Sequence, residues 1–111
     1  LLMNGACIIG YLRKKDMEFY GVDGKDLDGI VSQLRLTKGV EVAMFLYETE
    51  TQTFKVSLRS NGHVDVSRIA DYFGGGGHTR AAGCDLQGSM YDVINNVTRE
   101  IERQICMEKV R

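Results

Sequence analysis

Four consecutive glycines followed by a histidine form the part of this sequence that most suggests a binding site. The run reads GGGGH over residues 74–78. Each glycine costs roughly 0.5–1 kcal/mol of chain entropy relative to alanine, so four cost about 2–4 kcal/mol against a net stability of about 5–15 kcal/mol. Successive N–H groups that no side chain blocks can bind an anion, and the ring of His78 can donate as well. The run predicts a phosphate-binding loop; the alternative is a flexible connection between a helix and a strand.

Two well-known phosphate loops do not fit this run. A P-loop continues with Lys and then Ser or Thr after its last glycine, whereas His78, Thr79 and Arg80 follow here. A Rossmann fingerprint leaves a strand and opens a helix, whereas this run follows a predicted helix.

Two arginines are the next candidates, because a guanidinium offers a planar fork to phosphate oxygens and a flat face to a base. Arg59 precedes the turn at residues 60–62, where one end of a sheet could face the glycine run. Arg80 lies two residues after His78. For each arginine alone, and for His63 beside the turn, a solvated surface position is the alternative.

Patterns for catalysis by this chain alone are missing from the sequence. A two-metal hydrolytic centre needs several Asp, Glu or His ligands from short paired motifs, and the 2 histidines have no such companions. No local His and carboxylate pattern accompanies a Ser or Cys nucleophile. We therefore expect the chain to bind a ligand rather than to catalyse a reaction on its own.

The strands that must position these residues are visible as apolar patterns. Continuous apolar runs at residues 6–12 and 40–47 predict buried strands. Apolar and polar residues alternate over residues 54–58, which predicts a strand that forms an antiparallel hairpin with the strand at residues 40–47. The same alternation places Arg59 on the face away from the core. A further strand is predicted at residues 81–86.

Apolar residues at helical spacing predict a helix over residues 26–36, a short one over 66–73 and a long one from Ser89 onward. Asp26 and Asp65 are the predicted N-caps of the first two. Strands interleaved with helices, plus a hairpin, predict an α/β fold. Its mixed parallel and antiparallel sheet should have about four to five strands, with helices packed on it.

Length and charge narrow the class of protein. A chain of 111 residues suits one domain, and we expect that domain to occupy residues 1–111. The net charge of −1 excludes the broad basic field of sequence-indifferent duplex binders, so a nucleic acid must be contacted locally.

The cysteines and the N-terminal residues indicate the compartment. The 3 cysteines are too few and too widely spaced for a disulfide framework or a paired-thiolate zinc site, which favours a reducing, cytoplasmic setting. No targeting or membrane-spanning segment is recognised. Because the chain begins at Leu1 with Met3 behind it, we expect it to be part of a longer protein.

Several of these motifs together resemble the C-terminal DHH-associated domain of the DHH phosphoesterases. The motifs are RSNG at residues 59–62, DVS at 65–67, FGGGGH at 73–78 and AAGC at 81–84. The resemblance spans roughly residues 6–105. It is strongest to the branch of nanoRNA hydrolases and pAp phosphatases, with cyclic-dinucleotide phosphodiesterases as near relatives.

The resemblance implies a two-domain enzyme. An N-terminal DHH domain, expected upstream, would hold manganese or a similar divalent ion and activate a water. The DHH-associated domain, which the present chain resembles, would hold the phosphate and nucleotide part of the substrate across a cleft. By position, Gly75, Gly76, Gly77 and His78 would line the phosphate site, and Arg59 would contact substrate from the neighbouring strand.

Thr79 and Arg80 are carried over as further substrate-binding candidates at positions that vary between branches. The resemblance implies no catalytic residue and no metal ligand in this chain. The expected partners are a short single-stranded oligonucleotide or a phosphorylated nucleotide, the DHH domain of the same protein and a second copy in a homodimer; no membrane is implied.

Two other interpretations compete with a hydrolase origin. Related domains end the alanyl-tRNA synthetases, so this one could be a stand-alone nucleotide-binding, RNA-binding or assembly module without hydrolytic activity. A purely structural interpretation makes the glycine run a hinge and the C-terminal helix a dimer face.

Overall fold

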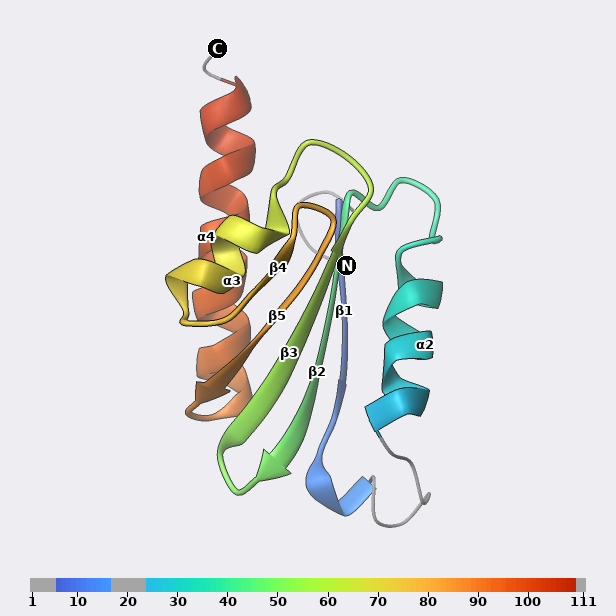
Figure 1. Cartoon of the computed structure of the whole chain (residues 1–111), viewed down its shortest axis with the longest axis vertical. Coiled ribbons are helices and arrows are strands. Elements are labelled where there is room, and N and C mark those ends of the chain that lie inside the picture. The colour runs from blue at the N-terminus through green and yellow to red at the C-terminus, as the bar shows by residue number, and fades with distance from the viewer. Residues whose placement is uncertain (1–5, 17–23, 110–111) are drawn as a thin grey trace.

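A central sheet with helices on both faces forms the fold (Figure 1). The computed structural model describes residues 6–16 and 24–109, without the side chains of residues 24–28 and 107–109. The helices and strands are, in chain order, β1 (Cys7–Leu12), α2 (Gly24–Leu34), β2 (Val42–Glu50), β3 (Thr53–Ser60), α3 (Val66–Tyr72), β4 (Gly76–His78), β5 (Ala81–Gln87) and α4 (Met90–Lys109).

The sheet is mixed, as the sequence predicts. Its five strands lie in the order β1-β2-β3-β5-β4. β1 runs parallel to β2, and the other neighbours are antiparallel. The predicted α/β class is therefore confirmed, and the strand count is at the upper end of the expected range.

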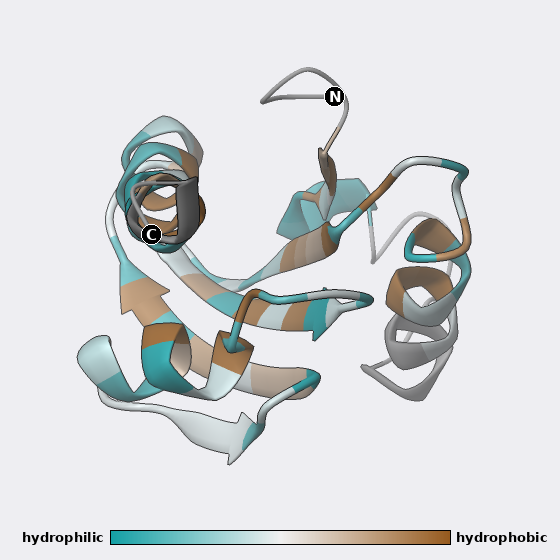
Figure 2. Ribbon diagram, turned by 90° about the horizontal axis from the view of Figure 1, so that it is seen from above, coloured by the Kyte–Doolittle hydropathy of each residue, from teal (hydrophilic) through white to brown (hydrophobic). Residues whose placement is uncertain are grey.

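Each face of the sheet carries its own apolar cluster, because alternate residues of a strand point to opposite faces. α3 and α4 cover one face, where Met44 of β2 and Leu58 of β3 are fully buried with Ile101 of α4. α2 covers the other face, where Val31 packs with Phe45. Figure 2, seen from above, shows the helices on opposite sides of the sheet.

The apolar cluster under α2, which we call the α2 cluster, occupies the part of that sheet face formed by β1 and β2. Its buried and half-buried members come from β1, α2 and β2, and none comes from β3, β4 or β5 among the described residues. We call the part of this face formed by β3, β5 and β4 the open half-face. Arg59 of β3 lies on it, because its partner on β2 is Ala43 of the α2 cluster.

The strand predictions are confirmed for the hairpin and corrected for β1. Leu46 pairs with Val56, and both lie in the core that α3 and α4 cover. β1 packs on both faces as predicted, because Cys7 and Ile9 join the cluster under α3 and α4 whereas Ile8 and Leu12 join the cluster under α2. It lies at an edge of the sheet, however, and Tyr11 is 55% exposed, so the prediction of a fully buried strand is corrected.

The predicted N-cap of α3 is confirmed, and that of α2 is wrong. Asp65 caps α3, its side chain accepting from the amides of Ser67 at 3.0 Å and Arg68 at 3.4 Å. Asp26 is not a cap, because α2 begins two residues earlier at Gly24. The helix dipole favours an acidic residue anywhere in a first turn, so the residue type alone does not fix the boundary.

The long C-terminal helix is confirmed as α4. Val93, Val97 and Ile101 form its buried face. Within the described residues, no helix combines the length and apolar character needed to cross a bilayer.

Candidate functional site

Half of the glycine run is a strand rather than a loop. Gly76, Gly77 and His78 form β4, the outer strand of the sheet, and pair with β5. Glycine disfavours strands, so sequence patterns gave no signal for this element. The predicted loop is therefore corrected to a short edge strand that ends at the candidate histidine.

Two glycines of the run are required because their backbone touches β5. A Cβ on Gly75 would lie 2.1 Å from the carbonyl oxygen of Gly83, and a Cβ on Gly77 would lie 2.5 Å from the Cα of Ala82. Gly77 also has φ +146°, which favours glycine. These two residues let β4 approach β5 more closely than any side chain would allow.

The other two glycines differ from each other. Gly74 ends the α3 region with φ +86°, a left-handed conformation suited to glycine at a helix end. Gly76 has no positive φ, and the nearest atom to a Cβ placed on it is Oδ1 of Asp71, at 3.8 Å. The fold therefore explains three glycines of the run and leaves Gly76 without a structural reason.

The amides of the run are only partly available to a ligand. Gly74 donates to the carbonyl of Asp71 at 3.0 Å, and Gly75 donates to that of Ala70 at 2.8 Å. The expectation of a continuous row of unblocked N–H groups is therefore too broad, because α3 engages the first two. Gly75 therefore has no free amide for a ligand, and its role is to let the backbone of the run lie against β5.

Arg59 and His78 lie on the same face of the sheet, in one row across three strands. His78 of β4 pairs with Ala81 of β5, and Ala81 pairs with Arg59 of β3. Directly paired residues of antiparallel strands have side chains on one face, and neighbouring strands lie ~4.8 Å apart, so the two outer Cα atoms are ~10 Å apart. The small Ala81 leaves space between the two long side chains.

Ala81 was not among the predicted site residues. The available signal was its position directly after the turn that follows His78. The pairing of Ala81 with Arg59 was not predictable, because the contact between β3 and β5 depends on the register of the whole sheet. The row of Arg59, Ala81 and His78 lies on the open half-face, since Ala43, the next residue along the row on β2, belongs to the α2 cluster.

Arg59 is half-buried and is held in place by one hydrogen bond. Its Nη1 donates to the carbonyl of Leu58 at 2.9 Å. A guanidinium has five N–H donors, so most of them remain for a ligand. In the described part of the chain the one ion pair joins Arg103 to Glu100, so no carboxylate neutralises Arg59 there.

The turn between β4 and β5 is fixed by backbone hydrogen bonds. The carbonyl of Thr79 accepts from the amide of Val66 at 3.0 Å, and that of Arg80 accepts from the amide of Ser60 at 2.9 Å. Both residues are exposed. The turn thus connects the start of α3 to the end of β3, and it carries two polar side chains beside His78.

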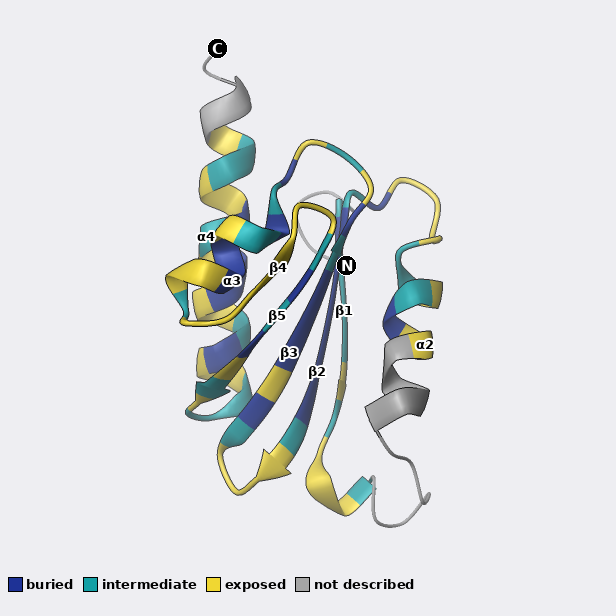
Figure 3. Cartoon of the chain, in the orientation of Figure 1, coloured by how far each residue is buried: buried dark blue, intermediate teal, exposed yellow. Residues whose placement is uncertain are grey.

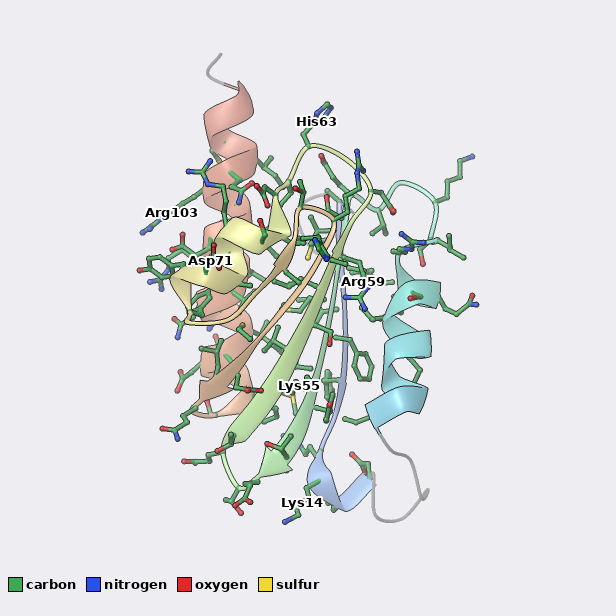
Figure 4. All side chains as sticks on the ribbon, viewed as in Figure 1. Lys14, Lys55, Arg59, His63, Asp71 and Arg103 are labelled. Atoms are coloured by element: carbon green, nitrogen blue, oxygen red, sulfur yellow. The ribbon has the colours of Figure 1, made fainter. Side chains whose placement is uncertain are left out.

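His63 lies apart from the row. It is exposed on the loop after β3, and its amide donates to Oε1 of Glu41 at 3.0 Å. Figure 4 shows it at the tip of that loop, away from Arg59. The structure does not bring it together with His78.

The cysteines offer no activated nucleophile in the described chain. Burial raises the pKa of the thiols of Cys7 and Cys84 to about 11, so both remain protonated at neutral pH. Cys84 packs in the core below β5. All three cysteines are free, and Cys106 is exposed on α4.

Comparison with known proteins settles the family. The DHHA1 domain family matches residues 4–106 of the chain. The chain belongs to this family. A curated relative in Thermus thermophilus, the bifunctional oligoribonuclease and PAP phosphatase NrnA, is 39% identical over 84 residues. The predicted nanoRNA hydrolase and pAp phosphatase branch is thereby confirmed.

The aligned region is a fraction of that relative. It covers 71% of this DHHA1 chain and 26% of NrnA, so the chain spans about a quarter of the relative's length. An exopolyphosphatase-related protein from Bacteroides fragilis has a similar structure. Its TM-score is 0.80 at 28% identity, and the match covers 93% of this chain and 30% of that one.

A second solved structure shares the fold alone. The C-Ala domain of alanyl-tRNA synthetase from Aquifex aeolicus matches with a TM-score of 0.64 at 12% identity, covering 87% of each chain. The same DHHA1 architecture therefore occurs in a protein of a different class.

Proposed function

We propose that this DHHA1 domain binds the phosphate of a short oligonucleotide or of a pAp-like nucleotide, as the substrate-binding part of a metal-dependent phosphoesterase. The observation that carries the proposal is the row of Arg59, Ala81 and His78 on the open half-face. A guanidinium and an imidazole on either side of a small residue can donate to one phosphate from two directions.

The named relative supports the substrate class. NrnA is described as an oligoribonuclease and PAP phosphatase, and both kinds of substrate carry the phosphate that the row would bind. Gly76 lies on β4 two residues before His78, and the fold itself would accept a side chain there. We assign it to ligand access, and we assign Thr79 and Arg80 to contacts at the rim of the same sub-site.

We place the metal chemistry outside this domain. Among the described side chains, those of residues 6–16 and 29–106, no group of three or more His, Cys, Asp and Glu gathers as a metal site requires. A DHH domain in the same protein would hold manganese or a similar divalent ion and supply an activated water. The role of this chain would be to hold the phosphate in position for attack, which is a large effect when the geometry is right.

His78→Ala in the full-length enzyme tests the proposal. We expect kcat/KM on a dinucleotide and on pAp to fall about 10- to 100-fold, the effect of losing a hydrogen bond to a charged group. Thermal unfolding should be unchanged, because His78 is exposed at the end of an edge strand. His63→Ala is the matched control and should behave as wild type. Unchanged kinetics of His78→Ala on both substrates would refute the assignment.

A further inference from the structure

The open half-face continues beyond the phosphate row toward the other end of β3. Lys55 points to this face because it lies four residues before Arg59 on the same strand. At a rise of ~3.4 Å per residue the two positions are ~13 Å apart. Lys55 is the exposed residue in the middle of the otherwise largely buried β3 (Figure 3).

Small residues separate the two cations. Ser57 lies between Lys55 and Arg59 on β3, and it pairs with Gly83 of β5, which in turn pairs with Gly76 of β4. Two of these three positions have no side chain. Ser57 itself is buried, so a ligand chain between the two cations would lie over Gly83, which is half-buried and has no side chain.

The composition of the open half-face does not suit a second protein layer. The half of the face under α2 presents Phe45 and Tyr47, which are buried there. Their neighbours on β3 are Ser57 and Lys55, which are polar. A helix packed on this half would take the charges of both Lys55 and its cross-strand neighbour Asp85 out of water, which is costly. Cationic and small residues instead complement a polyanion.

The open half-face carries the cations Lys55 and Arg59 although the whole chain has a net charge of −1. Two carboxylates lie at this surface: Asp85, which pairs with Lys55 across β3 and β5, and Asp71 of α3, whose Oδ1 is 3.8 Å from a Cβ placed on Gly76. Among the described residues Lys55 forms no ion pair, so its ammonium is not engaged by Asp85. Figure 4 shows Lys55 and Arg59 along the same strand.

We propose that Lys55 contacts a second phosphate of a single-stranded oligonucleotide whose first phosphate lies between Arg59 and His78. The substrate would run over Gly83 of β5, beside the buried Ser57 of β3. This inference rests on the proposed function and adds a length preference to it. A strand with several phosphates reaches Lys55, whereas a mononucleotide does not.

Binding of nucleotides of increasing length tests the inference. The full-length protein, freed of divalent metal by chelation so that nothing is hydrolysed, is titrated with pAp and with a tetranucleotide. Lys55→Ala should weaken tetranucleotide binding about three- to tenfold, and lower the slope of log affinity against log salt by about 0.7, the value for one phosphate contact with a single strand. It should leave pAp binding unchanged. Asp85→Asn should strengthen tetranucleotide binding, because it removes a repulsive charge.

The controls separate this inference from the proposed function. Arg99→Ala removes an exposed cation from α4, on the opposite side of the sheet, and should change nothing. Arg59→Ala should weaken binding of both ligands. If Lys55→Ala weakens neither ligand, or weakens both equally, the length preference is wrong and the proposed function stands. If the wild-type protein binds neither ligand, the proposed function itself fails.

Chemical labelling of lysine distinguishes a ligand from a covering domain. Lys55 should react with an acetylating reagent in the free full-length protein and become protected when the tetranucleotide is added. Protection of Lys55 before any ligand is present would show that another part of the protein covers the open half-face, and would overturn the inference.

Discussion

At the scale of single residues, the glycine run shows that one composition can have several causes. The entropic cost of four glycines directs attention to residues 74–77, but Gly75 and Gly77 are explained by contact with β5. That contact was not predictable, because it depends on which strand lies beside the run. Gly76 is the position for which the fold gives no reason, and we propose that close approach of a ligand to the backbone explains it.

Alanine substitutions along the run separate these causes. Gly75→Ala and Gly77→Ala should each destabilise the domain by about 1–3 kcal/mol, because the new methyl group overlaps the backbone of β5. Gly76→Ala should retain wild-type stability and weaken pAp binding. Thermal unfolding and calorimetric titration measure the two effects. A Gly76→Ala protein that binds pAp normally would remove this residue from the site.

The space above Ala81 gives a second test at this scale. Ala81→Leu places a larger side chain between Arg59 and His78, on a half-buried strand position that tolerates it. We expect a folded protein whose affinity for pAp is reduced at least about tenfold, since the phosphate and the side chain compete for one volume. Retention of full affinity would show that the phosphate does not lie between the two side chains.

At the scale of elements, periodicity predicted those that have a clear apolar pattern. The alternation of β3 placed Arg59 correctly because a period of two fixes the face of every residue. β4 was missed because three residues with two glycines carry no such pattern. The start of α2 was missed because Asp26 is as favourable within the first turn as before it.

The cap of α3 predicts a pH dependence of stability. Hydrogen bonds from Ser67 lower the pKa of Asp65 below its usual value, so the folded state favours the carboxylate. The stabilisation is fully present above the pKa of the unfolded chain, near ~4, and is lost as the pH falls through the lower pKa of the folded state.

Asp65→Ala should therefore cost about 1 kcal/mol of unfolding free energy at pH 7, and the difference from wild type should shrink below about pH 4. Asp65→Asn should stay near wild type at pH 7, because asparagine caps a helix about as well. Urea denaturation at several pH values measures all three proteins. A difference between Asp65→Ala and wild type that is the same at pH 7 and pH 3 would contradict the role assigned to the carboxylate.

At the scale of the whole molecule, the proposed binding surface and the larger core lie on different faces of the sheet. α3 and α4 cover one face and complete the larger core, whereas the open half-face lies on the other. The sequence predicted the buried faces of the helices. It could not predict which half of a sheet face stays uncovered, because that depends on where α2 rests.

A core substitution in α4 tests this division. Ile101→Ala should lower the unfolding free energy by about 2–5 kcal/mol, because Ile101 is fully buried against the sheet. Glu102→Ala, at the exposed neighbouring position, should change it by less than about 0.5 kcal/mol. If Ile101→Ala kept its stability and instead changed the oligomeric mass in light scattering, α4 would be a dimer face and not part of the core.

Titration of the isotope-labelled protein with pAp, followed through its amide resonances, tests the central claim most directly. We predict that shifts concentrate at residues 76–81 and at Arg59, with little change at the opposite end of the sheet near Glu48 and Gln52. Shifts confined to that opposite end, or to the α3 and α4 side, with residues 76–81 unmoved, would contradict it.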